Sequence, residues 1–226
     1  MNRNSKSSRK NALLHGSEVH VPADGGNCEA QVTEPAEPCP AKLFAAVRHL
    51  VDQDDYQAAE ILARNILQSA DESSLSTQPY LDLRLTLAFV LRKQGNFDEA
   101  ETICRDVIMR RQNTLGRLSD ETATSIYALA RLLRAKKDWS AGEAELRCLL
   151  EQQIACLGPE HDDTLWTHHV LGGFLAAAGN WRMAERAFQT AYIGRLNTLG
   201  KDDRLTQASL RSLLDCRGKQ PSSIDA

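Results

Sequence analysis

The sequence predicts an all-α fold, a solenoid of antiparallel helix hairpins that ends in a C-terminal capping helix. Three observations predict it. A Leu-Gly dipeptide returns at intervals of 42 residues, followed each time by a threonine in register, and an aromatic residue recurs at the same interval. A fixed period of this size indicates one supersecondary unit stacked on copies of itself. The recurring residues are Leu115-Gly116, Leu157-Gly158 and Leu199-Gly200, then Thr122, Thr164 and Thr206, then Phe97, Trp139 and Trp181.

Composition excludes several classes of protein. Of the 226 residues, 42% are hydrophobic and 25% charged, as in ordinary globular proteins, and the net charge of -3 disfavours a nucleic-acid binder. No apolar run approaches the roughly 18 residues that span a bilayer. The cysteines are scattered without a close CxxC pair, which favours free thiols in a reducing compartment, so we expect a cytoplasmic location. They are Cys28, Cys39, Cys104, Cys148, Cys156 and Cys216.

The first 40 residues are expected to form a disordered leader. Residues 1–16 carry four basic side chains among serines and no acid, which weakly resembles an organelle transit peptide. We favour a plain basic tail, because Leu13-Leu14 is too small an apolar face. Residues 17–40 are rich in Glu, Pro, Gly and Ala, and such a segment cannot bury enough apolar surface to offset its ordering entropy.

Helical periodicity begins near Ala41. Apolar residues at Leu43, Ala46, Val47 and Leu50 share one face and predict a helix over 41–51. The acidic stretch 52–55 ends it, and a second helix is predicted from 56 to 69, so that the two form a hairpin.

The same pairing predicts three more hairpins and a single last helix. Gly95, Gly179 and a Lys-rich turn at 136–138 separate the helices of each pair. The expected helices are 81–93 and 97–112, then 120–135 and 139–156, then 162–178 and 181–196, and last 203–216. The repeat domain is therefore expected over 41–217, divided as 41–78, 79–114, 115–156, 157–198 and a cap at 199–217, with a disordered tail at 218–226.

The segment LGPEHDDTLWTHHVLGGFLAAAGNWRMAERAF, residues 157–188, resembles the tetratricopeptide repeat in the 42-residue form of kinesin light chains. The resemblance implies a right-handed superhelix whose paired helices touch at small residues. These fall on Ala59, Ala100, Gly142 and Ala184, of which Gly142 is expected to weaken its helix by about 1 kcal/mol relative to alanine. The asparagine pair that grips peptide backbones in kinesin light chains is absent, so backbone capture in that manner is not expected. The leader also lacks the heptad coiled coil that would join a motor heavy chain, so a true kinesin light chain is not expected.

The resemblance also implies that the first helices line a concave groove that binds extended peptides. Its non-repeating positions would supply arginines for carboxylates or phosphates and aromatic side chains for binding energy. In the competing interpretation, the arginines are solvated and paired with nearby acids of the array. The candidate peptide-binding residues are Phe89, Arg92, Tyr127, Arg131, Arg134, Trp166 and His169.

No catalytic, cofactor or metal site is predicted. His168 and His169 are adjacent and point about 100° apart on a helix, so they do not suit one ion, and His161 falls in a loop. No nucleophile elbow or phosphate loop is present.

We therefore expect a non-catalytic scaffold that binds an acidic or mixed peptide or a partner helix, with no nucleic acid and no membrane. One alternative is a regulatory or sensor module related to the C-terminal repeats of fungal and bacterial signalling proteins. Another is an enzyme built on a helical scaffold.

Overall fold

The computed structural model describes residues 40–219, and this part of the chain contains nine α-helices, one short 3-10 helix and no strand. The expected leader and tail lie almost entirely outside the described residues. The helices are α1 (Pro40–Asp52), α2 (Tyr56–Ser69), η1 (Ser74–Ser76), α3 (Gln78–Gln94), α4 (Phe97–Leu115), α5 (Asp120–Lys136), α6 (Trp139–Leu157), α7 (Asp162–Ala177), α8 (Trp181–Leu199) and α9 (Arg204–Gly218).

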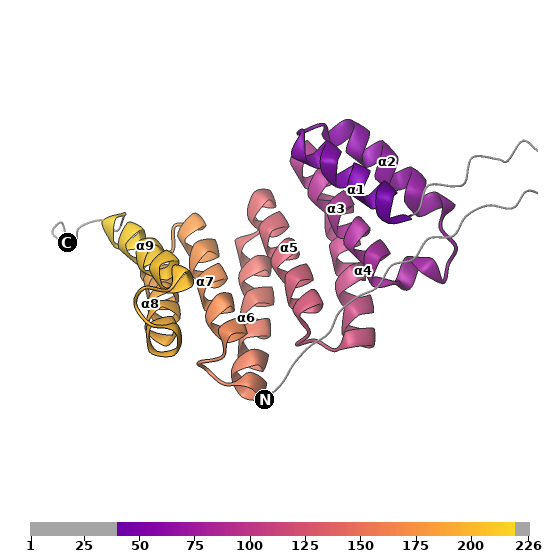
Figure 1. The fold of residues 1–226 in the computed structure, drawn as a ribbon. Coiled ribbons are helices and arrows are strands. Elements are labelled where there is room, and N and C mark those ends of the chain that lie inside the picture. The colour runs from indigo at the N-terminus through magenta and orange to yellow at the C-terminus, as the bar shows by residue number, and fades with distance from the viewer. Residues whose placement is uncertain (1–39, 220–226) are drawn as a thin grey trace, which may run out of the picture. The chain divides into compact units, whose positions relative to one another are not determined.

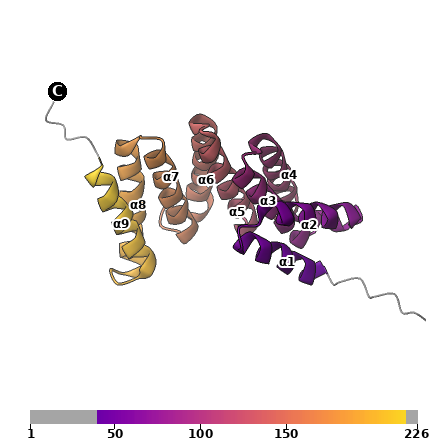
Figure 2. The same cartoon turned by 90° about the horizontal axis from the view of Figure 1, so that it is seen from above.

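The helices follow one another in chain order as four antiparallel hairpins and a last single helix (Figures 1 and 2). Each helix packs against its neighbours in the chain. The first helices of the hairpins, α1, α3, α5 and α7, and the last helix α9 also contact one another in succession. No contact of similar extent joins successive second helices. The first helices therefore lie on the inner, concave side of the stack.

Most expected helix boundaries agree with the structure to within two residues, and the larger differences have local causes. Helix α3 begins at Gln78, three residues early, because Pro79 fits the first turn, where its missing N–H is not needed. Helices α4 and α8 run three residues past their expected ends, to Leu115 and Leu199. They continue until the glycine of the seam ends them.

The recurring Leu-Gly dipeptide is the seam between hairpins. Gly116 has φ 86° and Gly158 has φ 96°, values that side chains with a Cβ resist. At the first two seams the threonine that follows in register bonds across the seam, since Thr122 Oγ1 donates to the Gly116 carbonyl at 2.8 Å. Thr164 Oγ1 makes the same bond to Gly158 at 2.8 Å. The repeat of these residues is therefore structural.

Helix pairs touch at the small positions, and one expectation there was wrong. Gly142 is buried, and a Cβ on it would lie 2.5 Å from Phe174 Cε2 and closer still to Cζ. The glycine therefore does not merely weaken α6. It makes room for the ring of Phe174, which is 4% exposed and packs edge-on against Trp139.

A buried polar pair crosses each later seam, and the sequence analysis missed it. Each time, a residue near the end of a second helix forms a hydrogen bond with a residue 14 positions later in the sequence, on the first helix of the next repeat. The hydrogen bonds are Arg111 Nη1 to Ser125 Oγ at 2.9 Å, Thr167 Oγ1 to Gln153 Oε1 at 2.6 Å, and Arg195 Nη1 to Ser209 Oγ at 2.7 Å. Because these groups are buried, they favour one register between neighbouring hairpins.

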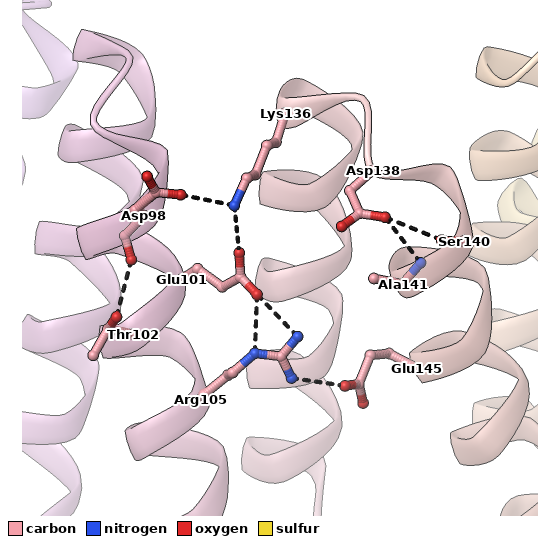
Figure 3. A network of polar contacts seen from close by, with 9 residues as sticks. All are labelled: Asp98, Glu101, Thr102, Arg105, Lys136, Asp138, Ser140, Ala141 and Glu145. Atoms are coloured by element: carbon pink, nitrogen blue, oxygen red, sulfur yellow. Dashed lines mark hydrogen bonds and ion pairs between the residues drawn. The ribbon is translucent and has the colours of Figure 1, made fainter.

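Charged side chains join the second helices to one another (Figure 3). Arg105 on α4 pairs with Glu101 in its own helix and with Glu145 on α6, both at 3.0 Å. Lys136, at the end of α5, reaches Asp98 at 2.7 Å and Glu101 at 3.0 Å. Arg64 on α2 repeats the pattern one hairpin earlier with Glu60 and Glu99. Solvent screens these largely exposed pairs, so they support the stack and do not define it.

Candidate functional site

The seven candidate residues lie on three neighbouring first helices, Phe89 and Arg92 on α3, three on α5, and Trp166 with His169 on α7. On α5 the spacing of Tyr127, Arg131 and Arg134 is three or four residues, so their side chains share one face. That face differs from the one that carries Leu129 and Leu133, which is fully buried.

Five of the seven side chains surround one hollow of about 510 Å³ between α3, α5, α7 and α9. Arg92, Arg131 and Arg134 line it from α3 and α5, and Trp166 and His169 line it from α7. The remaining lining is mostly apolar and was not predicted: Ala130, Val170, Gly173, Phe174, Phe188 and Ser212. The hollow therefore combines positive charge with an aromatic wall.

The three arginines form no ion pair with any acid in residues 40–219, although twelve other ion pairs occur there. Arg131 and Arg134 are exposed and Arg92 is half-buried. Burial lowers the pKa of Arg92, and the positive charges of Arg134 and Arg131 lower it further. The competing interpretation was that these arginines are solvated and paired with acids of the array. Within the described residues its pairing part is wrong, whereas Arg131 and Arg134 are exposed to solvent as it expected. We name Arg92, Arg131 and Arg134 the arginine cluster.

Phe89 lies beside the hollow and not in its wall. It lines a smaller neighbouring pocket together with Arg92 and Arg131. The Arg92 guanidinium carbon is 4.9 Å from the centre of the Phe89 ring, which is 38% exposed. The ring therefore makes a cation–π contact with the Arg92 guanidinium.

Tyr127 has a largely structural position. Its ring packs against both buried apolar clusters, and its hydroxyl lies 2.6 Å from Thr167 Oγ1. Burial raises the pKa of Tyr127. The ring edge lines a second hollow of about 340 Å³, shared with Arg131 and Trp166, so Tyr127 offers apolar surface and not a free hydroxyl.

Trp166 and His169 belong to a cluster that includes a residue missed by sequence reasoning. The two rings stack at 5.8 Å between centres, and the Arg195 guanidinium lies 5.6 Å from the Trp166 ring. Burial and, to a lesser extent, the charge of Arg195 together lower the pKa of His169 to about 4. The missed residue is Arg195, which is 2% exposed. It lies two repeat periods after Arg111, and this recurrence of arginine in the sequence could have identified it.

The opposite end of the first helices carries acids. Asp120 and Asp163, in the first turns of α5 and α7, line the second hollow. Because the arginine cluster lies toward the C-terminal ends of α3 and α5, the inner surface is basic along one side and acidic along the other. The seven candidate residues predicted from the sequence include the arginines of the basic side but neither of these two acids.

The histidines do not converge. His168 lines a separate pocket formed by α6, α7 and α8, whereas His169 lines the 510 Å³ hollow. His161 caps α7, where its Nδ1 accepts a hydrogen bond from the backbone N–H of Asp163 at 3.3 Å. Within residues 40–219 no group of three or more His, Cys, Asp or Glu side chains could hold a metal ion. The four cysteines of this range are free thiols.

The fold and the groove define a helical-repeat protein with a partly basic inner surface. The sequence pattern of the tetratricopeptide repeat matches residues 79–141 and 128–197, more than half of the chain. The chain belongs to this family. No curated protein matches it by sequence.

Solved structures share the fold at low identity. Nearly identical TPR-like repeats assigned to a kinesin light chain of Podosopora anserina superpose with a TM-score of 0.64 and 19% identity, over 80% of this chain and 87% of that chain. BtubC (BKLC) from P. vanneervenii gives a TM-score of 0.55 and 17% identity, over 83% and 87%. In residues 40–219 no helix is both long and apolar enough to cross a bilayer.

Proposed function

We propose that the inner groove binds an acidic or mixed-charge peptide, or a helix, of a protein partner, and that the chain acts as a non-catalytic, cytoplasmic scaffold. One observation carries the proposal. Three arginines that lack acidic partners within the described residues line a hollow beside Trp166 and two phenylalanine rings. Arginine and large aromatic side chains are the residue types that dominate binding energy at protein interfaces.

The groove offers two kinds of contact to a ligand, one through charge and one through apolar surface. The arginine cluster supplies planar donors for carboxylates, and the wall formed by Trp166, Phe174 and Phe188 accepts an apolar side chain. Asp120 and Asp163 on the far side would pair with a basic residue of the same ligand, which makes a mixed-charge peptide fit as well.

The test compares capture of protein partners by two charge-reversed double variants. Arg131→Glu with Arg134→Glu should abolish partner capture from a lysate of the source cells, read by mass spectrometry, because both residues line the hollow. The matched control is Arg182→Glu with Arg186→Glu, two exposed arginines on α8 with the same change in charge. It should keep the partners, and circular dichroism should show equal helical content for all three proteins.

Equal capture by the groove variant and the wild type would overturn the proposal. If both variants lose partner capture equally, binding depends on the net charge of the protein and not on the groove, and the proposal is overturned as well.

A further inference from the structure

We propose that the arginine cluster binds a phosphate monoester on a side chain of the peptide ligand. This inference deepens the proposed function and rests on it, since it names the chemistry that the groove recognises. The ligand would be a protein segment phosphorylated on serine, threonine or tyrosine, with the phosphate between Arg92, Arg131 and Arg134 and a neighbouring apolar group against the aromatic wall.

The first argument is the amount of uncompensated charge. Three guanidinium groups line one hollow, and within residues 40–219 none has an acidic partner. Some other arginines of this range pair with acids, for example Arg84 with Asp106, whereas others, such as Arg204, form no ion pair there. The arginine cluster differs because it gathers three guanidinium groups without acidic partners around one hollow. A carboxylate brings one negative charge, whereas a phosphate monoester brings between one and two at neutral pH and three acceptor oxygens. A phosphate therefore matches three converging arginines better than one carboxylate does.

The second argument is that the arginines interact with one another. The positive charges of Arg134 and Arg131 on α5 lower the pKa of Arg92 on α3, so like charges from two helices lie close enough to repel one another. Such an arrangement costs free energy in the absence of an anion, and a bound dianion would remove that cost. Phe89 holds the Arg92 guanidinium in place, which reduces the entropy lost on binding.

Stabilisation of helix ends does not account for the cluster. Arg92 and Arg134 do lie in the last turns of α3 and α5, where positive charge is favourable. That effect acts within each helix and requires no convergence of side chains from two helices. It also leaves out Arg131, which lies before the last turn.

The surroundings restrict where a phosphate can bind. Asp120 and Asp163 line the neighbouring hollow and would repel it there, so the anion is directed to the arginine side. Trp166, together with the buried rings of Phe174 and Phe188, lies across the 510 Å³ hollow. The ring of a phosphotyrosine, or an apolar residue next to a phosphoserine or phosphothreonine, could occupy this wall.

The test measures binding of fluorescein-labelled degenerate nonapeptide pools to the full chain by fluorescence anisotropy. The pools differ only in a fixed central residue, which is phosphothreonine, phosphotyrosine, threonine or glutamate. We expect at least one phosphorylated pool to bind about ten-fold or more tightly than the glutamate pool, because phosphate accepts more charge-assisted hydrogen bonds. The tighter of the two phosphorylated pools identifies the source of the phosphate.

Variants assign the effect to the cluster. Arg131→Glu with Arg134→Glu should remove the preference for phosphate. Arg131→Lys with Arg134→Lys should lose roughly half of it on a logarithmic scale, since lysine keeps the charge and lacks the bidentate fork. The control Arg182→Glu with Arg186→Glu should bind within about two-fold of the wild type, as expected for charges outside the groove.

Each contrary outcome is informative. If the glutamate pool binds as tightly as the phosphorylated pools, the ligand is a carboxylate, from a partner or from the acidic segment 17–40 of this chain, and the phosphate proposal is overturned while groove binding stands. A phosphate preference that survives in the Arg131→Glu, Arg134→Glu variant overturns the assignment to the cluster. Binding of no pool also overturns the phosphate proposal, and the capture experiment then judges groove binding separately.

Discussion

At the scale of single residues, two glycines of this chain should respond in opposite directions to the same substitution. Gly142→Ala should destabilise the protein by about 1–3 kcal/mol, because its Cβ would overlap the Phe174 ring in a packed core. Gly173→Ala, in α7, should stabilise by about 0.5–1 kcal/mol, because a Cβ there meets nothing within 4 Å and alanine is the better helix former. Urea denaturation measures both. A gain in stability for Gly142→Ala would show that the ring moves aside freely.

His169 should make the protein less stable in mild acid. Its pKa is about 4 in the fold against an ordinary value of 6.5, so the unfolded chain binds more protons between these two pH values. The stability that neutral His169 adds to the fold is therefore fully present above pH 6.5 and is lost as the pH falls toward 4. The histidine resonances in a proton NMR titration should include one with a midpoint near 4 that disappears in His169→Gln. A midpoint at or above 6.5 for that resonance would contradict the expectation.

A neutral His169 also has a consequence for binding. At neutral pH it adds no charge to the groove, so the positive potential there comes from the arginine cluster and from Arg195 behind Trp166. The ring instead stacks on Trp166 and contacts Phe188 edge-on at 5.3 Å, which fixes the aromatic wall.

At the scale of helices, Arg111 shows that stacking also depends on polar contacts. It is 1% exposed and pairs with Asp82 on α3, and it donates to Ser125 on α5 as well. Arg111→Ala should cost about 1–3 kcal/mol, because it leaves the buried Ser125 hydroxyl without its donor and opens a cavity. Its neighbour Arg110 is a matched control, since its ion pair with Asp106 is only half-buried and open to solvent, and Arg110→Ala should cost under about 1 kcal/mol. Similar losses of denaturation free energy in both variants would rule out the distinction.

The helices and their pairing were predictable because both depend on short-range patterns. Apolar periodicity and the 42-residue interval required no knowledge of contacts, and so the hairpins and the first-helix positions of Arg131 and Trp166 followed from them. Polar residues that cross a seam were not predictable in this way. Gln153 and Ser125 are buried, yet each looks like a surface residue when its helix is considered alone.

The same limit applies to the candidate site. A helical pattern places Arg92 and Arg131 on one side of the array but does not say whether an acid on another helix neutralises them. That depends on the distance between helices, which the structure supplies. It also brings Phe188 and Ser212, from α8 and α9, into the wall of the hollow. The binding role of these residues stays a prediction.

At the scale of the whole repeat domain, α9 acts as a cap whose uncovered side differs from every earlier first helix. Leu213 and Cys216 are buried against the last hairpin, whereas Leu214 is 54% exposed. Leu214 occupies the position held by Ala88, Ala130 and Gly172 in the earlier repeats, where a small residue admits the second helix of the hairpin. No second helix follows α9 within the described residues, so a leucine is accommodated there.

Loss of the cap contact should therefore weaken one end of the stack and leave the other unchanged. Repeat arrays are stabilised by contacts between nearest neighbours, so a local defect spreads only as far as neighbouring hairpins remain coupled. Leu213→Ala should cost about 2–5 kcal/mol locally and accelerate amide hydrogen exchange in α7, α8 and α9, whereas α3 and α4 belong to a separate buried cluster and should keep their protection. Leu214→Ala, next to it and exposed, should change neither region. Equal acceleration in α3 and α8 would mean that the four hairpins unfold as one cooperative unit, and the capping argument would then fail.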